Sequence, residues 1–249
     1  MTRTEFLARI RGEVTRARPL FKAELSERPV RAGERLEILR RELRERWPRT
    51  LERFRQEFER AGGVFHRVAS LEQVPETVST LARAHGMRRL VAWHAEALGG
   101  DLCTALTERG LETLAMPSAS PDAAERARLR ETIASAELGL TAADLAVAET
   151  GSLVLVSGAG RPRSTSLLPA CHVALFDRDA LVESLGQVGL VLEAWHETAA
   201  PAARGGVISF ITGPSRTADI ELTLTRGVHG PKDVHAVFVE GGLGARDRV

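Results

Sequence analysis

After Gly62-Gly63 the chain alternates short apolar runs with runs of helical spacing, and this alternation constrains the fold more than any other feature. The predicted strands are 64–68, 89–93, 111–116, 145–148, 153–156, 173–176, 207–212 and 235–240. The predicted helices are 74–85, 102–109, 121–137 and 178–185. Such an order is typical of an α/β fold with a largely parallel sheet covered by helices on both faces. The break at Thr150-Gly151-Ser152 also fits a hairpin, which would make the sheet mixed.

The first sixty residues form a separate region of the sequence with a helical pattern. Phe6, Ile10 and Val14 have helical spacing, and Glu34–Arg60 carries one apolar stripe in which Pro48 either kinks the helix or starts a new segment. Residues 1–60 hold 17 Lys and Arg against 11 Asp and Glu. A basic docking surface and an amphipathic helix packed on the domain both fit. We favour packing, because the aromatic residues lie on the apolar stripe. The predicted domains are a helical extension, 1–61, and an α/β domain, 62–249.

Composition narrows the class of protein. Of the 249 residues, 43% are hydrophobic, which predicts a real hydrophobic core. The net charge of +1 predicts neither nucleic acid nor an acidic membrane as a partner. Two cysteines, Cys103 and Cys171, are too few for an iron–sulfur cluster or a structural zinc site, and the scattered histidines predict no metal site. The sequence has no membrane span and no signal-peptide core, so we expect a cytoplasmic protein.

The clearest candidate site lies in Ile208–Pro231, which reads ISFITGPSRTADIELTLTRGVHGP. An apolar run ends at a turn, polar side chains follow, and a second compact loop comes later. The candidate anion ligands are Gly213, Pro214, Ser215, Arg216, Thr217, Asp219 and Gly230, with His229 as a candidate acid or base. Backbone N–H groups and a helix start after such a turn attract anions, and Arg216 can hold a carboxylate or phosphate with two parallel hydrogen bonds. The alternative is an ordinary turn capped by Ser215, which leaves Arg216, Asp219 and His229 unexplained.

Three ordered motifs resemble the LUD (lactate utilisation) domain family, of the lactate-utilisation protein C type. They are GPSRTADIE with GVHGP, the AETGSLV block at Ala148–Val154 with Ser152 where Thr is commoner, and the P-x-x-H element of Pro169 and His172. The resemblance covers about Gly62 to Glu240. It implies a three-layer α/β sandwich similar to the ribose-phosphate isomerase and CoA-transferase fold.

Glu149 follows an apolar strand and precedes Thr150 and Gly151, where a carboxylate is suited to act as a base or nucleophile and glycine admits a ligand to the backbone. Capping of backbone N–H groups is the structural alternative for Glu149. We predict Glu149 and His229 as catalytic groups and add Thr150, Gly151 and His172 to the anion site. We also predict that the loops of Glu149, Arg216 and His229 converge.

Three lesser candidates remain open. The loop Gly158–Ser166 contains two arginines and three hydroxyls and suits either an anion-binding lid or a solvated loop. Trp93-His94 stands at a strand end that would border the pocket. Trp195-His196 stands in an expected loop that would serve as a lid.

Three functions fit the sequence. The resemblance implies a non-redox component of lactate catabolism that binds a small carboxylate and works beside iron–sulfur subunits, which oxidise L-lactate to pyruvate and alone carry the clusters. A stand-alone CoA-transferase-like or isomerase-like enzyme would use Glu149, although that analogy is three residues long. A non-enzymatic assembly or sensing module would dock partners through its N-terminal helices.

Overall fold

The computed structural model describes residues 2–17, 31–118, 122–198, 206–218 and 224–244, and its centre is a parallel sheet. Six strands pair in parallel throughout, in the order β1-β12-β7-β4-β2-β3. Their bounds are β1 Val64–Val68, β2 Arg89–Ala92, β3 Glu112–Ala115, β4 Leu138–Ala142, β7 Cys171–Phe176 and β12 Asp233–Val239. All amino ends therefore meet at one edge of this sheet and all carboxyl ends at the other. The predicted α/β class with a mostly parallel sheet is confirmed.

A second, four-stranded sheet lies beside the first, in the order β8-β5-β6-β9. Its strands are β5 Leu145–Val147, β6 Ser152–Ser157, β8 Leu181–Val182 and β9 Val207–Ile211. β5 and β6 form the antiparallel hairpin that the Thr150-Gly151-Ser152 break suggested. The prediction of one sheet was wrong, because the strands at β5, β6 and β9 pair with one another and with β8 in a sheet of their own. The central strand β4 was not predicted. Gly139 and Ala142 give that strand little β propensity, and it directly follows a helix.

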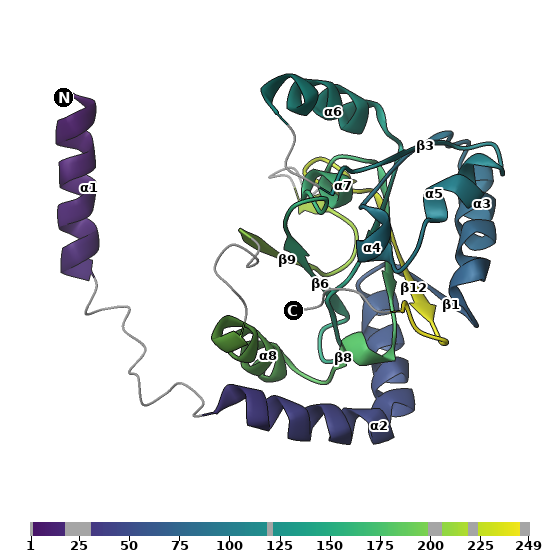
Figure 1. Cartoon of the computed structure of the whole chain (residues 1–249), viewed down its shortest axis with the longest axis horizontal. Helices are drawn as coiled ribbons and strands as arrows, with labels where there is room; N and C mark the ends of the chain where they lie inside the picture. Colours follow the sequence, from purple (N-terminus) through teal and green to yellow (C-terminus); the bar gives the residue numbers. More distant parts are fainter. Residues whose placement is uncertain (1, 18–30, 119–121, 199–205, 219–223, 245–249) are drawn as a thin grey trace.

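Helices cover both faces of the parallel sheet (Figure 1). The helices are α1 Arg3–Ala17, α2 Ala32–Arg60, α3 Val74–Ala84, α4 Ala95–Leu98, α5 Leu102–Thr107, α6 Ala123–Ser135, α7 Ser164–Leu167 and α8 Leu185–Thr198, with 3₁₀ turns at Leu71–Gln73 and Arg178–Ala180. α3 lies on the face of His235, because the ring of His85 at its end contacts that of His235. α2 lies on the opposite face, where Phe54 meets Phe176 edge-on with ring centroids 5.0 Å apart.

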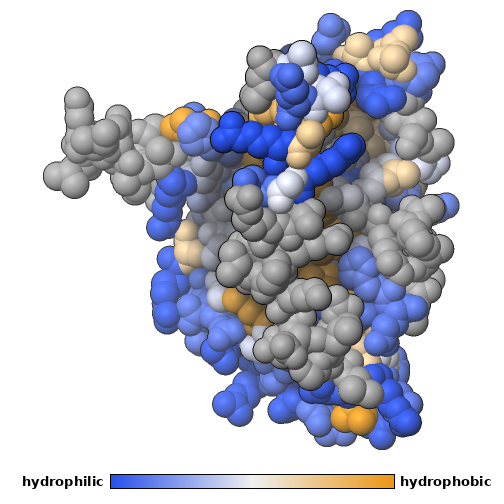
Figure 2. Space-filling view, turned by 90° about the vertical axis from the view of Figure 1, so that its left-hand side faces the viewer, coloured by the Kyte–Doolittle hydropathy of each residue, from blue (hydrophilic) through white to orange (hydrophobic). Residues whose placement is uncertain are grey.

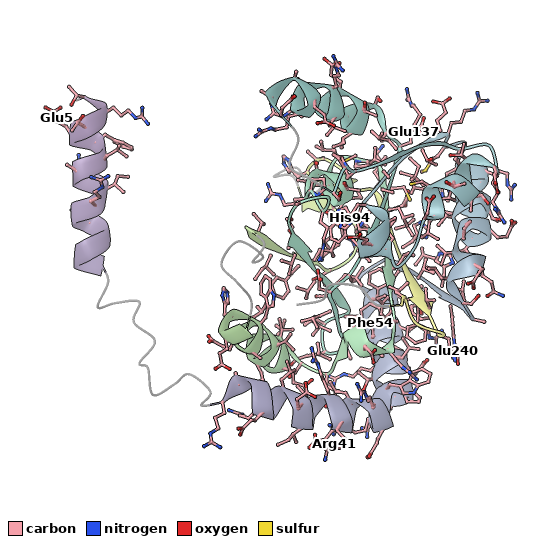
Figure 3. All side chains as sticks on the ribbon, viewed as in Figure 1. Glu5, Arg41, Phe54, His94, Glu137 and Glu240 are labelled. Atoms are coloured by element: carbon pink, nitrogen blue, oxygen red, sulfur yellow. The ribbon has the colours of Figure 1, made fainter. Side chains whose placement is uncertain are left out.

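α2 is one helix of 29 residues with Pro48 inside it, and Figure 1 shows it change direction along its length. Proline removes one helical hydrogen bond and crowds the preceding turn, which accounts for the bend. Its second half buries Leu51, Phe54 and Phe58 in the main core, and Phe54 is labelled in Figure 3. Its first half buries another apolar set against α8 and the second sheet: Ala32, Leu36, Leu39 and Leu43. The packing interpretation of this helix is confirmed.

Two local predictions were wrong. Residues 178–185 are a 3₁₀ turn followed by β8, and α8 begins where the predicted helix was to end. Asp177 fixes that 3₁₀ turn, because its carboxylate accepts a hydrogen bond from the Asp179 N–H at 3.1 Å. Trp195 and His196 consequently lie on α8 and not in a loop.

α1 stands apart from the other elements in Figure 1. Phe6, Leu7 and Ile10 on it are 40–46% exposed. In the view of Figure 2 hydrophilic residues dominate the rim of the molecule, and hydrophobic surface shows near the middle. The core that positions the candidate site is therefore built without α1.

Candidate functional site

The two predicted anion loops lie side by side at the amino end of the parallel sheet. The Ser215 N–H donates to the Pro231 carbonyl at 2.9 Å, and the Gly227 N–H donates to the Ser215 carbonyl at 3.1 Å. The Lys232 N–H then donates to the Ala170 carbonyl at 2.8 Å, which ties the second loop to the start of β7. We call residues 213–216 and 227–232 the amino-end loops. Backbone hydrogen bonds fix their geometry, so their exposed side chains are free to meet a ligand.

Arg216 extends from the amino-end loops to the end of α2. Its guanidinium donates to the Ala61 carbonyl at 2.7 Å. Gly62 has φ +92°, and a Cβ there would overlap the guanidinium of Arg216, so glycine is needed for this contact. One hydrogen bond uses only part of a guanidinium, which has five N–H groups. The contact with Ala61 therefore orients Arg216 and leaves donors for an anion.

The remaining residues of the first loop support this geometry. Gly213 has φ +82° and packs against the Ala61 carbonyl, and Pro214 is buried beside it. Thr217 continues into a two-stranded hairpin of β10 Arg216–Ala218 and β11 Leu224–Arg226. The expectation of a helix start here was wrong, because a strand follows the turn and brings no helix dipole. Asp219 lies outside the described residues.

His229 is exposed in the second loop, and Gly230 touches the first loop. A Cβ on Gly230 would lie 3.3 Å from the Cβ of Ser215. Glycine therefore allows the two loops to approach closely. An exposed imidazole on a loop that touches the Arg216 loop is suited to act as an acid or base toward a ligand bound there.

The loop of Glu149 joins the same region through hydroxyl groups. Thr150 and Ser152 share a hydrogen bond of 2.7 Å, and Ser152 and Thr212 share one of 2.6 Å. Gly151, with φ +62°, packs on α2, where an added Cβ would lie 2.3 Å from the Phe58 nitrogen. The β5–β6 turn and the first amino-end loop are thus both anchored on the end of α2.

The carboxylate of Glu149 is occupied elsewhere. Its Oε2 accepts a hydrogen bond of 3.0 Å from the Leu185 N–H, at the first residue of α8. This is the capping contact that was the structural alternative for Glu149. The chain thus brings the backbones of the three loops together, while the Glu149 carboxyl group is turned to the start of α8.

His172 is fully buried on β7 and does not reach the surface. Its Nε2 shares a hydrogen bond of 2.8 Å with the Thr141 hydroxyl. Burial, with a smaller contribution from His235, lowers its pKa to about 3, so the ring is neutral at physiological pH. In this position His172 is suited to support the start of β7 beneath α7, where Gly139 packs directly against the Thr165 carbonyl.

A second polar cluster lies at the carboxyl end of the sheet, and the sequence did not predict that its residues come together. Asp144 follows β4 and is 4% exposed, and its Oδ1 accepts a hydrogen bond of 2.6 Å from Arg161. The Asp144 Oδ2 accepts another from the Val156 N–H at 2.8 Å. The Arg161 guanidinium lies 4.7 Å from the centre of the Trp93 ring, and the Trp93 indole donates to the Pro162 carbonyl at 3.2 Å.

Trp93-His94 and the Gly158–Ser166 loop therefore do meet, as Gly160 accepts a hydrogen bond from the His94 N–H at 3.1 Å. The sequence indicated part of this cluster, because Trp93-His94 was expected at a strand end bordering a pocket. Nothing in the sequence marked Asp144 as a member of the cluster, because it is a single acid between two apolar strands. The ion pair fixes the loop against the sheet, so the loop is held and not a free lid.

The described ranges contain no group of three His, Cys, Asp or Glu side chains placed to hold a metal ion. Cys171 is buried, and burial raises the pKa of its thiol to about 12. In the same ranges, none of the helices combines the length and the apolar content needed to cross a bilayer.

Comparison with known proteins identifies the class to which this fold and these loops belong. The family model of the LUD domain matches residues 51–239, so the chain belongs to the LUD domain family. The match begins within α2, at Leu51, the first buried residue of that helix in the main core.

Two individual relatives match shorter stretches of the chain than the family model does. The chain is 43% identical to lactate utilization protein C of Halalkalibacterium halodurans over 120 residues, which is 48% of this chain and 51% of that protein. It is 31% identical to lactate utilization protein C of Macrococcus caseolyticus over 169 residues, covering 68% of this chain and 69% of that protein. The chain thus spans about half the length of the first relative and about two thirds of the second.

The crystal structure of a DUF162 family protein from Deinococcus radiodurans has a similar fold. Its TM-score to this chain is 0.52 at 21% identity, and the match covers 78% of this chain and 98% of that one.

Proposed function

We propose that this chain is a component of lactate utilisation that binds a small carboxylate at its amino-end loops and works with iron–sulfur subunits that oxidise L-lactate to pyruvate. The observation that carries the proposal is the contact between the Ser215–Arg216 loop and the His229 loop in a member of the LUD domain family. The names of the two relatives support the pathway. The resemblance suggests the iron–sulfur partners, since two cysteines cannot ligate a cluster here.

Each group at the site has a proposed role. Arg216, oriented by the Ala61 carbonyl, holds the carboxylate of the ligand with its remaining N–H groups. The Ser215 hydroxyl adds a hydrogen bond, and the exposed imidazole of His229 exchanges a proton with the hydroxyl or carbonyl group of the ligand. Glu149 supports the site through its turn, because its carboxylate already accepts the Leu185 N–H.

Calorimetry with the purified chain tests the ligand half of the proposal. The ligands are L-lactate, pyruvate, other small carboxylates and acyl-CoA esters, and the variants are Arg216→Gln and Arg216→Lys. Arg60→Gln is the matched control, because Arg60 lies at the same end of α2 but pairs with Glu57 at 3.0 Å. We expect a carboxylate that binds wild type and Arg60→Gln, binds Arg216→Lys weakly and fails to bind Arg216→Gln. Carboxylate binding that survives Arg216→Gln would contradict this site, and a CoA ester bound through Glu149 would favour the CoA-transferase alternative.

A genetic test addresses the pathway half separately. Removing this chain from the organism that encodes it is expected to abolish growth on L-lactate and to leave growth on pyruvate intact. Restoring the wild-type chain restores growth on lactate, whereas the Arg216→Gln variant does not. Unimpaired lactate growth without the chain would refute the proposed role in the pathway.

A further inference from the structure

We propose that a pocket between the first half of α2 and the 3₁₀ turn Arg178–Ala180 binds the phosphoryl group of a small molecule. The pocket has a volume of about 210 Å³ and lies outside the amino-end loops. Its lining is Arg40, Leu43, Arg44, Arg178, Asp179 and Leu181. The lining thus combines three arginines with one aspartate and two leucines.

Two of the three arginines of this pocket have no ion-pair partner among the described residues. Arg40 pairs with Glu37 at 3.2 Å, and this pair on one helix is largely exposed. Within the described residues, Arg44 and Arg178 form no ion pair with a carboxylate. Bringing guanidinium groups together without counter-charges costs Coulomb energy, which an anion bound between them recovers.

The supports of the three arginines are rigid, so the pocket is formed before a ligand arrives. Leu36, Leu39 and Leu43 bury the inner face of α2. On the other side, Asp177 is 1% exposed and accepts hydrogen bonds from the Asp179 N–H at 3.1 Å and the Leu243 N–H at 3.0 Å. Because both supports are fixed, binding an anion orders few additional groups.

The position of the pocket in the fold also points to a ligand. Arg178 and Asp179 follow directly after β7, at the carboxyl end of a central strand of the parallel sheet. Open α/β sheets bind their ligands outside the carboxyl ends of their strands. The pocket therefore lies at the edge of the sheet opposite the amino-end loops, where α2 passes across the carboxyl end.

Charge and size together favour a phosphoryl group. Its charge of about −1.5 to −2 near pH 7 is opposite in sign to the net positive charge that the three arginines give this pocket, even after Asp179 and the Glu37 partner of Arg40 are subtracted. Its three terminal oxygens accept hydrogen bonds from several arginines at once. A volume of about 210 Å³ is smaller than the pockets of about 300–1,000 Å³ that enclose whole drug-sized ligands. The pocket thus fits the phosphoryl end of a ligand whose remainder extends into solvent.

The test is calorimetric titration of the full chain with inorganic phosphate and with pyrophosphate at constant ionic strength. The variants are Arg44→Gln and Arg178→Gln. The matched control is Arg41→Gln, since Arg41 is on the same helix and points away from the body in Figure 3. We expect saturable binding that each pocket variant weakens by about tenfold or more, which is the loss of one charge-assisted hydrogen bond. The Arg41→Gln variant should bind within about twofold of wild type.

Arg216→Gln serves as the second control, because it separates this pocket from the proposed carboxylate site. Phosphate binding that survives Arg216→Gln and fails in Arg44→Gln supports the pocket whether or not a carboxylate binds at the amino-end loops. Absence of saturable binding at millimolar pyrophosphate would overturn the proposal. An equal loss in Arg41→Gln would also overturn it, because diffuse attraction to the basic helix would then explain the binding. Unchanged thermal unfolding of each variant shows that the fold is intact.

Discussion

The two ends of the parallel sheet present polar groups in opposite ways. At the amino end, the Ser215–Arg216 and His229–Gly230 loops are short, close in sequence and joined by backbone hydrogen bonds, and the imidazole and guanidinium groups are exposed. At the carboxyl end, Asp144 and Arg161 form a buried ion pair, and the arginine-lined pocket lies nearby on the same edge. The amino end has the motifs of the family, and the carboxyl end has the position where α/β folds usually bind ligands.

This difference separates two ways in which a fold can build a site. The amino-end loops owe their shape to local turns and glycines, so a change there is expected to alter binding more than stability. The carboxyl-end groups come from distant parts of the chain and hold loops and elements together. A change in the ion pair is therefore expected to alter stability first.

The largest expected effect is at the buried ion pair. Asp144→Asn removes the negative charge that pairs with the Arg161 guanidinium, at a residue that is 4% exposed. Breaking such a buried pair costs about 3–5 kcal/mol of unfolding free energy. Arg216→Gln removes one hydrogen bond at the exposed amino end and costs about 0.5–1.5 kcal/mol. Urea denaturation of both variants measures the difference. Equal losses of unfolding free energy would show that the carboxyl-end ion pair contributes no more to stability than the amino-end loops do.

The next effect tests whether the β5–β6 turn is fixed to α2. Gly151→Ala introduces a Cβ at φ +62° that would lie 2.3 Å from the Phe58 nitrogen. We expect a loss of about 2–4 kcal/mol, from left-handed strain together with overpacking. Gly86→Ala is the control, since Gly86 has φ +67° with no atom within 4 Å of the added Cβ. That variant should lose only the strain, about 1–2 kcal/mol. Thermal or urea unfolding that shows no difference between the two would remove the contact as an anchor.

A third effect depends on pH and concerns the buried histidines. Burial lowers the pKa of His235 from 6.5 to about 4, with smaller contributions from His66 and His85. The His66 Nε2 lies 3.0 Å from the His235 Nδ1. The unfolded chain then binds more protons than the folded chain below about pH 6.5, so stability falls as the pH drops from 7 toward 4. His235→Gln should reduce this fall by about 1–2 kcal/mol between pH 7 and pH 5. A pH profile of unfolding that is flat in the wild type would contradict the assignment.

Much of the fold follows from local patterns that a sequence displays. Strands such as Val173–Phe176 and the apolar stripe of α2 were recognised because burial of β-branched and aromatic side chains fixes both their period and their location. β4 and α8 were not recognised. Gly139 lowers strand propensity in the first, and Gly186 and Gly189 lower helix propensity in the second. Tertiary packing, which a single sequence does not display, stabilises both elements.

The candidate site divides in the same way. Ser215, Arg216 and His229 are recognisable because turn residues and charged residues are adjacent in the chain. The contact of Arg216 with Ala61 and that of Glu149 with Leu185 join residues far apart, and both depend on where α2 and α8 end or begin. The arginines of the pocket, at positions 40, 44 and 178, form no motif, because only the folded chain brings two turns of α2 beside the end of β7.

The smallest expected effect tests the link between the Glu149 turn and the Arg216 loop. Ser152 is buried and shares hydrogen bonds with Thr150 and Thr212. Ser152→Ala should cost about 1 kcal/mol, because it leaves neighbouring hydroxyls without their partner. In a double-mutant cycle with Thr212→Val, we expect a coupling energy of about 0.5–1 kcal/mol, measured by urea denaturation. Ser152→Thr, which keeps the hydroxyl, should retain most of the stability. If the two single variants simply add, the turn and the loop are independent.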